Sequence, residues 1–404
     1  AVGKDGEDGA DGVSGGSGDS WFDNVYFDEA NQTLVLVYGG QEFELQVVPD
    51  TGVPSDEMAE KAPEIKGEPN VSIPNFSTFI EDGSDGRVMR MSLTGIQLPN
   101  NEWMELYGTG DTRQNVWLEI DGEPKGIAVI NGTETQTRAF NISKAQADVV
   151  FLVDNSGSMS EEADAVANEI LSWSQTLAGT MDVQFGCVGI DHSYINGAID
   201  ITSVENLSDY LNRDGLYGTA RTRGYVDTQL ETSAQTYNNA GGECGGIMLH
   251  FADQHFKFRP GANRIYIYFT DEPNQPGGIE EWSVLTVNPE SSYYVWNTSK
   301  GTIHTVFSDM NNYLPDSYNW VDFFNEDPRL FATYTGGTLI ETTGDFNITL
   351  DELPVTGAIT NSYIIRFNVT PDLLSGTHTV KITIYDEKGN IQAEKTWENV
   401  SFSV

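Results

Sequence analysis

Three oxygen-bearing side chains in the middle of the chain have a spacing that suits a hard metal ion. The run 154–158 reads Asp-Asn-Ser-Gly-Ser and follows the apolar stretch 148–153. Asp154 would bring a carboxylate to a strand end, and Ser156 and Ser158 would place two hydroxyls on the next turn. Mg²⁺ prefers about six oxygens and accepts water among them. The run predicts a cation site for Mg²⁺, or for Ca²⁺ or Mn²⁺, although a turn with N-capping serines is the plainer alternative.

A second carboxylate is expected at the same place. Asp271 follows the apolar run 264–270, and ligands of open α/β sheets bind at the carboxyl ends of the strands. Asp154 and Asp271 would therefore meet at one edge of a sheet.

Asp-x-Ser-x-Ser between a strand and a helix resembles the metal-ion-dependent adhesion site of von Willebrand factor type A (VWA) and integrin-type domains. The resemblance covers residues 147–356 and implies that Asp271 contacts the cation through water. It also implies a Thr or Glu ligand before the next long helix. In this sequence Glu243 is the candidate, and Thr222 is the alternative.

Other residues are expected near the same edge. Asp191 and His192 follow a strand end, and Glu272 follows Asp271, so these three are candidates for a ligand-binding face. The chain has two cysteines, Cys187 and Cys244. They could form a disulfide in an exported protein or remain two small buried thiols.

The elements around these residues alternate between apolar strands and helical stretches. Strands are expected at 148–153, 183–190, 198–201, 264–270, 302–307 and 338–341, with a helix over about 160–177. Such alternation predicts an α/β domain with a doubly wound, mostly parallel sheet over 147–356.

The flanking regions have a different pattern. Residues 1–20 are rich in Gly and Asp and predict a flexible tether, followed by a small β-hairpin module at 21–50 and a linker at 51–69. Short strands separated by turn signals predict the first part of a β-sandwich at 70–146. Residues 357–404 would complete that sandwich, with the α/β domain inserted in or attached to it, or would form a separate β-domain.

The net charge of the chain limits the kinds of partner that it is expected to bind. Lys and Arg number 21 against 61 Asp and Glu, a formal net charge of -40, which repels nucleic acid. No apolar run is long enough to predict a transmembrane segment. The N-terminal Gly/Asp-rich segment resembles a module of Bacteroidetes surface lipoproteins. That resemblance implies an exported protein, on the cell surface or outer membrane or facing the periplasm, with a lipid anchor upstream of Ala1.

The function expected from these features is metal-dependent adhesion rather than catalysis. The cation would bridge to an acidic group of a protein or glycan partner. One alternative is a structural or assembly component of a surface complex or pilus-like structure, with a cation that stabilises the fold. A second alternative is a metal-dependent hydrolase, for which Glu243 and Asp191 are the only visible general bases.

Overall fold

The computed structural model describes most of the chain and divides it into two compact units, Ala1–Gly52 and Val53–Val404. The expected tether at 1–20 lies outside the described residues. These are 23–28, 33–46, 56–83, 86–108, 114–131, 146–159, 163–180, 182–212, 221–238, 240–296, 300–308, 326–342, 350, 354–386 and 391–402.

The first unit contains a three-stranded antiparallel sheet in the order β1-β2-β3. Its strands are β1 (Asn24–Asp28), β2 (Thr33–Tyr38) and β3 (Gln41–Gln46). Gly39 and Gly40 form the tight turn between β2 and β3, and both have a positive φ, which glycine adopts without steric cost.

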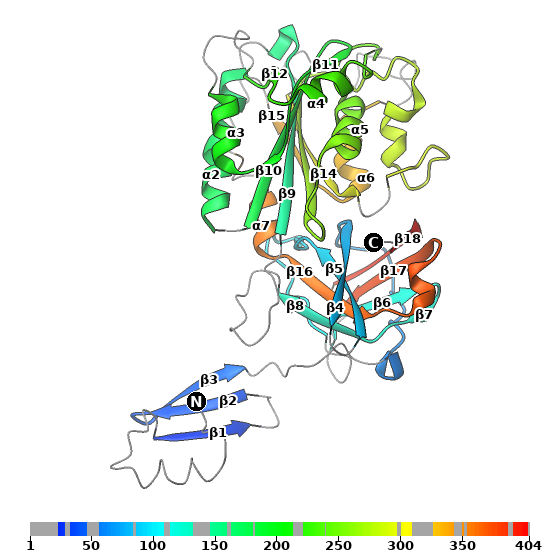
Figure 1. Ribbon diagram of the computed structural model, residues 1–404. Coiled ribbons are helices and arrows are strands. Elements are labelled where there is room, and N and C mark those ends of the chain that lie inside the picture. Colours follow the sequence, from blue (N-terminus) through cyan, green and yellow to red (C-terminus); the bar gives the residue numbers. More distant parts are fainter. Residues whose placement is uncertain are drawn as a thin grey trace. The chain divides into compact units, whose positions relative to one another are not determined.

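The second unit contains one seven-stranded mixed sheet in the order β12-β11-β10-β9-β13-β14-β15 (Figure 1). All neighbours in it are parallel except β10 and β11, which form an antiparallel hairpin. The central strand β9 is buried over almost its whole length because it is covered on both faces. The strands are β9 (Gln146–Asp154), β10 (Asp182–Asp191), β11 (Tyr194–Thr202), β12 (Gly224–Tyr225), β13 (Asn263–Thr270), β14 (Thr302–Ser308) and β15 (Leu339–Thr342).

Six α-helices in the described residues pack on this sheet. Two separate apolar cores lie on its two faces, one including Trp173 and Phe151 and the other Trp296 and Tyr266. Figure 1 shows α2 and α3 on one face and α5 and α6 on the other. The helices are α2 (Ala163–Thr180), α3 (Val204–Leu211), α4 (Thr228–Ala234), α5 (Gly245–His255), α6 (Arg329–Thr335) and α7 (Val355–Thr360).

Two four-stranded antiparallel sheets share a third core in the same unit, which includes Met91 and Ile365 from one sheet and Leu118 and Ile382 from the other. Their orders are β4-β5-β16-β8 and β18-β17-β6-β7. The C-terminal strands therefore pair with strands that precede residue 132. The strands are β4 (Phe76–Gly83), β5 (Gly86–Leu93), β6 (Val116–Ile120), β7 (Glu123–Pro124), β8 (Ile127–Asn131), β16 (Tyr363–Asn368), β17 (His378–Tyr385) and β18 (Gln392–Val400).

The fold class expected from the sequence, a doubly wound α/β protein, is wrong for this chain. Of the four sheets formed by the residues that the structure describes, three are entirely antiparallel and the fourth is mixed. The alternation of apolar strands and helical stretches is a local pattern, and it specifies neither the direction of each strand nor the share of the whole chain that is β. His192, at φ 53°, lies in the turn that reverses the chain between β10 and β11. The chain is predominantly β.

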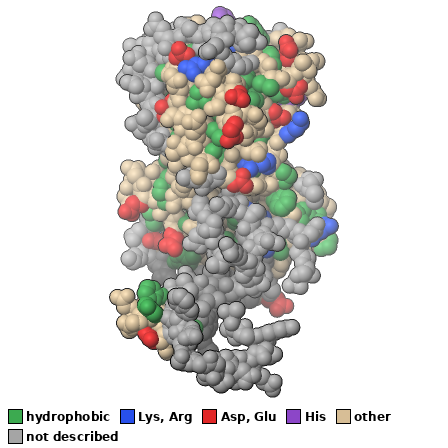
Figure 2. Space-filling model, turned by 60° about the vertical axis from the view of Figure 1, so that its left-hand side comes forward, with side chains coloured by type: hydrophobic (Ala, Val, Ile, Leu, Met, Phe, Trp, Pro, Cys, Tyr) green, Lys and Arg blue, Asp and Glu red, His purple; other side chains and the backbone are tan. Residues whose placement is uncertain are grey.

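The acidic side chains on the face drawn in Figure 2 are dispersed and do not form one patch. Figure 2 shows Asp and Glu side chains scattered over one face, with fewer Lys and Arg side chains between them. Among the helices of the described residues, none is both long and apolar enough to cross a membrane.

Candidate functional site

The site lies where β9 and β13 end. The two strands are parallel neighbours, and their register pairs Val153 with Phe269. The residues that follow, Asp154 and Asp271, therefore lie at the same edge of the sheet. Residues 149–153 of β9 and 265–269 of β13 are buried and mostly apolar, and polar side chains follow them at the carboxyl ends of the two strands.

Hydroxyl groups connect the two strand ends. The backbone N–H of Ser156 donates to Asp154 Oδ1 at 2.8 Å, which tightens the turn after β9. The Oγ atoms of Ser156 and Ser158 are 2.9 Å apart, and Ser158 Oγ donates to Asp271 Oδ1 at 3.1 Å. The two serines and Asp271 thus form a continuous chain of oxygens.

The burial of Asp154 changes the pKa of its carboxyl group. Its side chain is 1% exposed and accepts a second hydrogen bond from Thr270 Oγ1 at 3.2 Å. Burial raises the pKa of Asp154 well above its usual range, and the negative charges of Asp271 and Glu243 raise it further. A cation placed among these groups would stabilise the ionised carboxylate and would therefore lower the pKa of Asp154 again.

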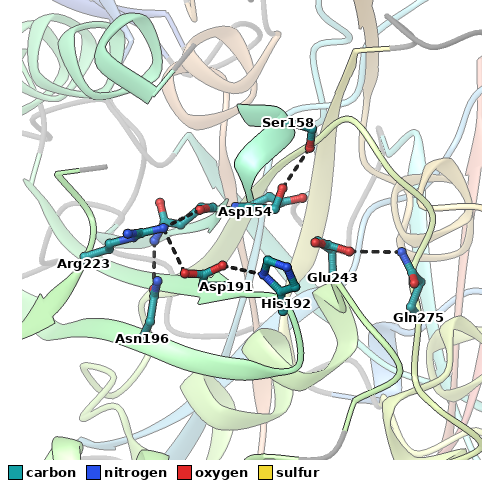
Figure 3. Close-up of polar contacts among 10 residues, drawn as sticks. Asp154, Ser158, Asp191, His192, Asn196, Arg223, Glu243 and Gln275 are labelled. Atoms are coloured by element: carbon teal, nitrogen blue, oxygen red, sulfur yellow. Dashed lines mark hydrogen bonds and ion pairs between the residues drawn. The ribbon is translucent and has the colours of Figure 1, made fainter. Parts of the chain in front are cut away.

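Two further carboxylates approach from neighbouring segments. Gln275 Nε2 donates to Glu243 Oε2 at 3.1 Å, a contact drawn in Figure 3. The same nitrogen donates to Glu272 Oε2 at 2.9 Å, so one carboxamide holds both acids. Burial raises the pKa of Glu272 to about 7, and Glu243 and Asp271 add to the rise. Glu243 and Asp271 therefore lie near enough to Asp154 to affect its pKa, and Gln275 connects Glu272 to Glu243.

Asp191 and His192 form a second polar group beside the acids. Asp191 Oδ1 lies 2.7 Å from His192 Nδ1, and Arg223 Nη2 donates to Asp191 Oδ2 at 2.9 Å. Figure 3 shows Asp191 between the two basic side chains. The hydrogen bond with Asp191 raises the pKa of His192. Both carboxylate oxygens of Asp191 are thus engaged by its two neighbours.

Thr222, the alternative ligand, is occupied elsewhere. It is 2% exposed, and its Oγ1 donates to Asn155 Oδ1 at 2.5 Å. Asn155 Nδ2 in turn donates to Asn196 Oδ1 at 2.9 Å. The sequence reasoning missed Asn155, Thr270 and Gln275, which orient the site. Only Thr270 and Asn155 had a local signal, their place next to an expected ligand.

The structure forms no disulfide between Cys187 and Cys244, so the pairing considered from the sequence is not made. Cys187 lies in the core on one face of the mixed sheet, and Cys244 lies in the core on the other. Cys244 Sγ donates to Asn274 Oδ1 at 3.2 Å, and burial raises the pKa of its thiol to about 12. The sheet itself keeps the two sulfurs apart.

In the part of the chain that the structure describes, no group of three or more His, Cys, Asp and Glu side chains is arranged to hold a metal ion. The expectation of an integrin-like adhesion site is wrong in this respect. The acids are held by Ser156, Thr270 and Gln275 instead of converging on one point.

Comparisons with known proteins give no family for the chain. No family model matches it, and no curated protein matches it. Among solved structures, it is similar to the PilB minor pilin from Streptococcus sanguinis, at 10% identity over 83% of this chain and 86% of that chain, with a TM-score of 0.29. An aspartate-to-alanine mutant of that pilin gives 11% identity over 81% and 84%, with a TM-score of 0.34.

A third solved structure is the adhesive tip pilin GBS104 from Group B Streptococcus agalactiae. It is 13% identical over 32% of this chain and 46% of that chain, with a TM-score of 0.22. This chain therefore matches less than half the length of that pilin. The family expected from the sequence, a VWA protein of the Bacteroidetes surface lipoprotein kind, is wrong on this comparison, because no family model matches the chain.

Proposed function

We propose that this chain is a non-catalytic structural component of an exported surface assembly, and that a divalent cation at the end of β9 stabilises its fold. The observation that carries the proposal is the setting of Asp154. It is fully buried, its hydrogen-bond donors Ser156 and Thr270 are neutral, and the charges that raise its pKa are negative. A buried carboxylate in such a setting is costly unless a positive charge compensates it.

The donor set fits a small hard cation. An octahedral Mg²⁺ with ligands at roughly 2.1 Å places adjacent oxygens about 3 Å apart. The Ser156–Ser158 and Ser158–Asp271 oxygen separations are 2.9 and 3.1 Å. These three side chains would hold the ion, and Asp154 and Glu243 would add negative charge around it. Two of the three proposed direct ligands are hydroxyls. This is consistent with the arrangement of the carboxylates, which do not form a metal-binding group by themselves in the described residues.

Burial favours a stabilising cation over one that bridges to a partner. Asp154, Ser156 and Asp271 are each no more than 3% exposed, and Glu243 is 8% exposed. A partner carboxylate would have to reach past these residues, with Ser158 as the accessible ligand. An ion enclosed by two strand ends and a turn would instead oppose their separation, as a bound ligand of the folded state does.

The architecture supports a structural role. The chain leaves the antiparallel sheets after β8, forms the mixed sheet, and returns through β16, so two covalent connections join the parts. Asn75 Nδ2 donates to the carbonyl of Gly301 at 3.1 Å, and Ser92 Oγ donates to that of Gly261 at 3.4 Å. The two covalent connections and these two hydrogen bonds would oppose movement of the antiparallel sheets relative to the mixed sheet. The net charge of -40 suits an exposed, soluble surface.

Thermal unfolding of chelated protein tests the cation. Adding Mg²⁺, Ca²⁺ or Mn²⁺ at 100 times its Kd should raise the Tm of the wild type by roughly 5 °C. Asp154→Asn should abolish the rise and, in chelator, should melt no lower than wild type because a buried charge is removed. An unchanged wild-type Tm with all three ions would remove the cation from the proposal.

The assembly role needs a separate measurement. Surface material released from the producing cells should contain the chain in particles much larger than its mass of 44.4 kDa. Recovery of the chain only as a free monomer in that material would contradict the structural role, whatever the cation result.

A further inference from the structure

A pocket lined in part by Asp191 and Arg223 has the chemistry of a carbohydrate site. It has a volume of ≈ 490 Å³ and lies between the first residues of β11, the short strand β12 and the helix α4. That volume falls within the usual range for small-molecule sites. We propose that this pocket binds a neutral saccharide of one or two pyranose units, independently of the cation. The proposal goes beyond the structural role.

Two tyrosines provide the apolar part of the pocket. Tyr194 is 47% exposed at the start of β11. Tyr225 donates from its hydroxyl to the carbonyl of Ile195 at 2.6 Å, which fixes its ring against β11. Rigid aromatic rings offer an apolar surface at small entropic cost, and the C–H face of a pyranose packs on such a surface.

The polar part consists of side chains that can exchange hydrogen bonds with hydroxyls. Gln235, which caps the end of α4, and Asn238, four residues beyond the helix, are exposed and line the pocket. Asn238 Nδ2 donates to the carbonyl of Gln235 at 2.7 Å, which positions its carboxamide, a group with both donors and an acceptor. An isolated backbone bridge between Tyr194 and Asn238 holds the two sides of the pocket together. The bridge places a ring and a carboxamide side by side, an arrangement that suits a polyhydroxyl ring.

The charges of the pocket argue against an anionic ligand. Its cation, Arg223, is paired with Asp191 over 2.9 Å and also donates to the carbonyl of Asn155 (Figure 3). Glu231 on α4 adds a negative charge to the lining. A phosphate or carboxylate would meet this acid, whereas a neutral saccharide can donate hydroxyl protons to it.

Saturation-transfer NMR on the full chain in EDTA tests the proposal. The probes are methyl α-mannopyranoside, methyl β-galactopyranoside and methyl β-N-acetylglucosaminide. At least one should receive saturation on the protons of one ring face. Tyr194→Ala should weaken its binding about tenfold, equivalent to about 1.4 kcal/mol. Asn238→Ala should weaken it by a smaller factor, and Tyr107→Ala, an exposed tyrosine outside the pocket, should leave it unchanged.

Three outcomes would overturn the proposal: no transfer to any of the three probes, transfer that Tyr194→Ala leaves intact, or transfer that disappears in EDTA. Stronger, Glu231-dependent binding of a cationic probe, N-acetyl-lysine methylamide, would assign the pocket to basic ligands instead. None of these results depends on whether the cation stabilises the fold, because the Tm measurement is separate.

Discussion

Ser158 donates a hydrogen bond to Asp271 over 3.1 Å although the two residues are 113 positions apart in the chain. The contact exists because β9 and β13 are parallel neighbours and end at the same level. It joins the turn after one strand to the end of the other, so it makes the stability of this edge depend on both segments.

Ser158→Ala should therefore weaken this edge in two ways. Without metal, loss of the hydroxyl that bridges Ser156 and Asp271 should cost about 1 kcal/mol of unfolding free energy. With Mg²⁺, the variant should also lose most of the cation-dependent rise in Tm. The measurement is thermal unfolding with and without chelator. Ser172→Ala, at an exposed position of α2, is the matched control and should behave as wild type.

The ion pair between Arg259 and Asp148 should be the costliest one to break. Asp148 is fully buried, and it accepts from Arg259 Nε at 2.6 Å and from the Arg259 backbone N–H at 2.7 Å. Arg259→Met would leave a buried carboxylate without its cation and should cost on the order of 3 kcal/mol in urea unfolding.

Removing the charge as well should restore part of that loss. Asp148→Asn combined with Arg259→Met should be more stable than Arg259→Met alone, because no buried charge remains uncompensated. Equal stability of the single and double variants would show that lost packing of Arg259, not charge, explains the effect.

Two glycines should respond in opposite directions to the same substitution. A Cβ on Gly246, at the start of α5, would lie 1.9 Å from the carbonyl oxygen of Trp282, so Gly246→Ala must displace the backbone and should cost more than about 2 kcal/mol. Gly179 in α2 has open space around its Cβ position. Gly179→Ala should stabilise by about 0.5–1 kcal/mol. Urea unfolding checks both, and a mild effect at Gly246 would contradict this packing.

The sequence predicts local features of the site better than its surroundings. An apolar run bounded by Asp154 indicates the central strand, because burial on both faces requires continuous apolar residues. The approach of Gln275 to Glu243 and Glu272 is different. It depends on how the loops after β13 and before α5 fold over one another, and no periodicity encodes that.

The direction of a strand is also not encoded by periodicity, since β10 and β11 pair antiparallel in a sheet whose other neighbours are parallel. The sequence likewise left open whether the C-terminal strands pair with the strands before residue 132 or form a domain of their own. The antiparallel pairing of β16 with β5 joins Arg366 to Arg90 in register, across more than two hundred residues. Alternating polar and apolar residues identify each strand, but they do not specify its partner. The separation of Cys187 and Cys244 is likewise a property of the assembled sheet, since each residue looks like an ordinary buried thiol in sequence.

Acid should destabilise the protein in part through His304. This residue is 5% exposed on β14, and its Nδ1 accepts from the backbone N–H of Thr338 at 3.1 Å, so the ring is held neutral. Burial lowers the pKa of His304 to about 4, below the 6.5 of an exposed histidine. The unfolded chain therefore binds this proton first. The contribution of neutral His304 to the free energy of unfolding is therefore fully present above pH 6.5. It is lost as the pH falls toward 4, and the loss is on the order of 3 kcal/mol.

His304→Gln should remove that dependence, because a carboxamide does not titrate in this range. The unfolding free energy of wild type and variant is to be measured by urea titration from pH 4.5 to 7.5, and the difference between them should shrink steadily as the pH falls below 6.5. His192→Gln serves as control, since His192 is exposed and its pKa is raised by Asp191. A difference between wild type and His304→Gln that stays constant across this pH range would show that His304 is not held neutral by burial.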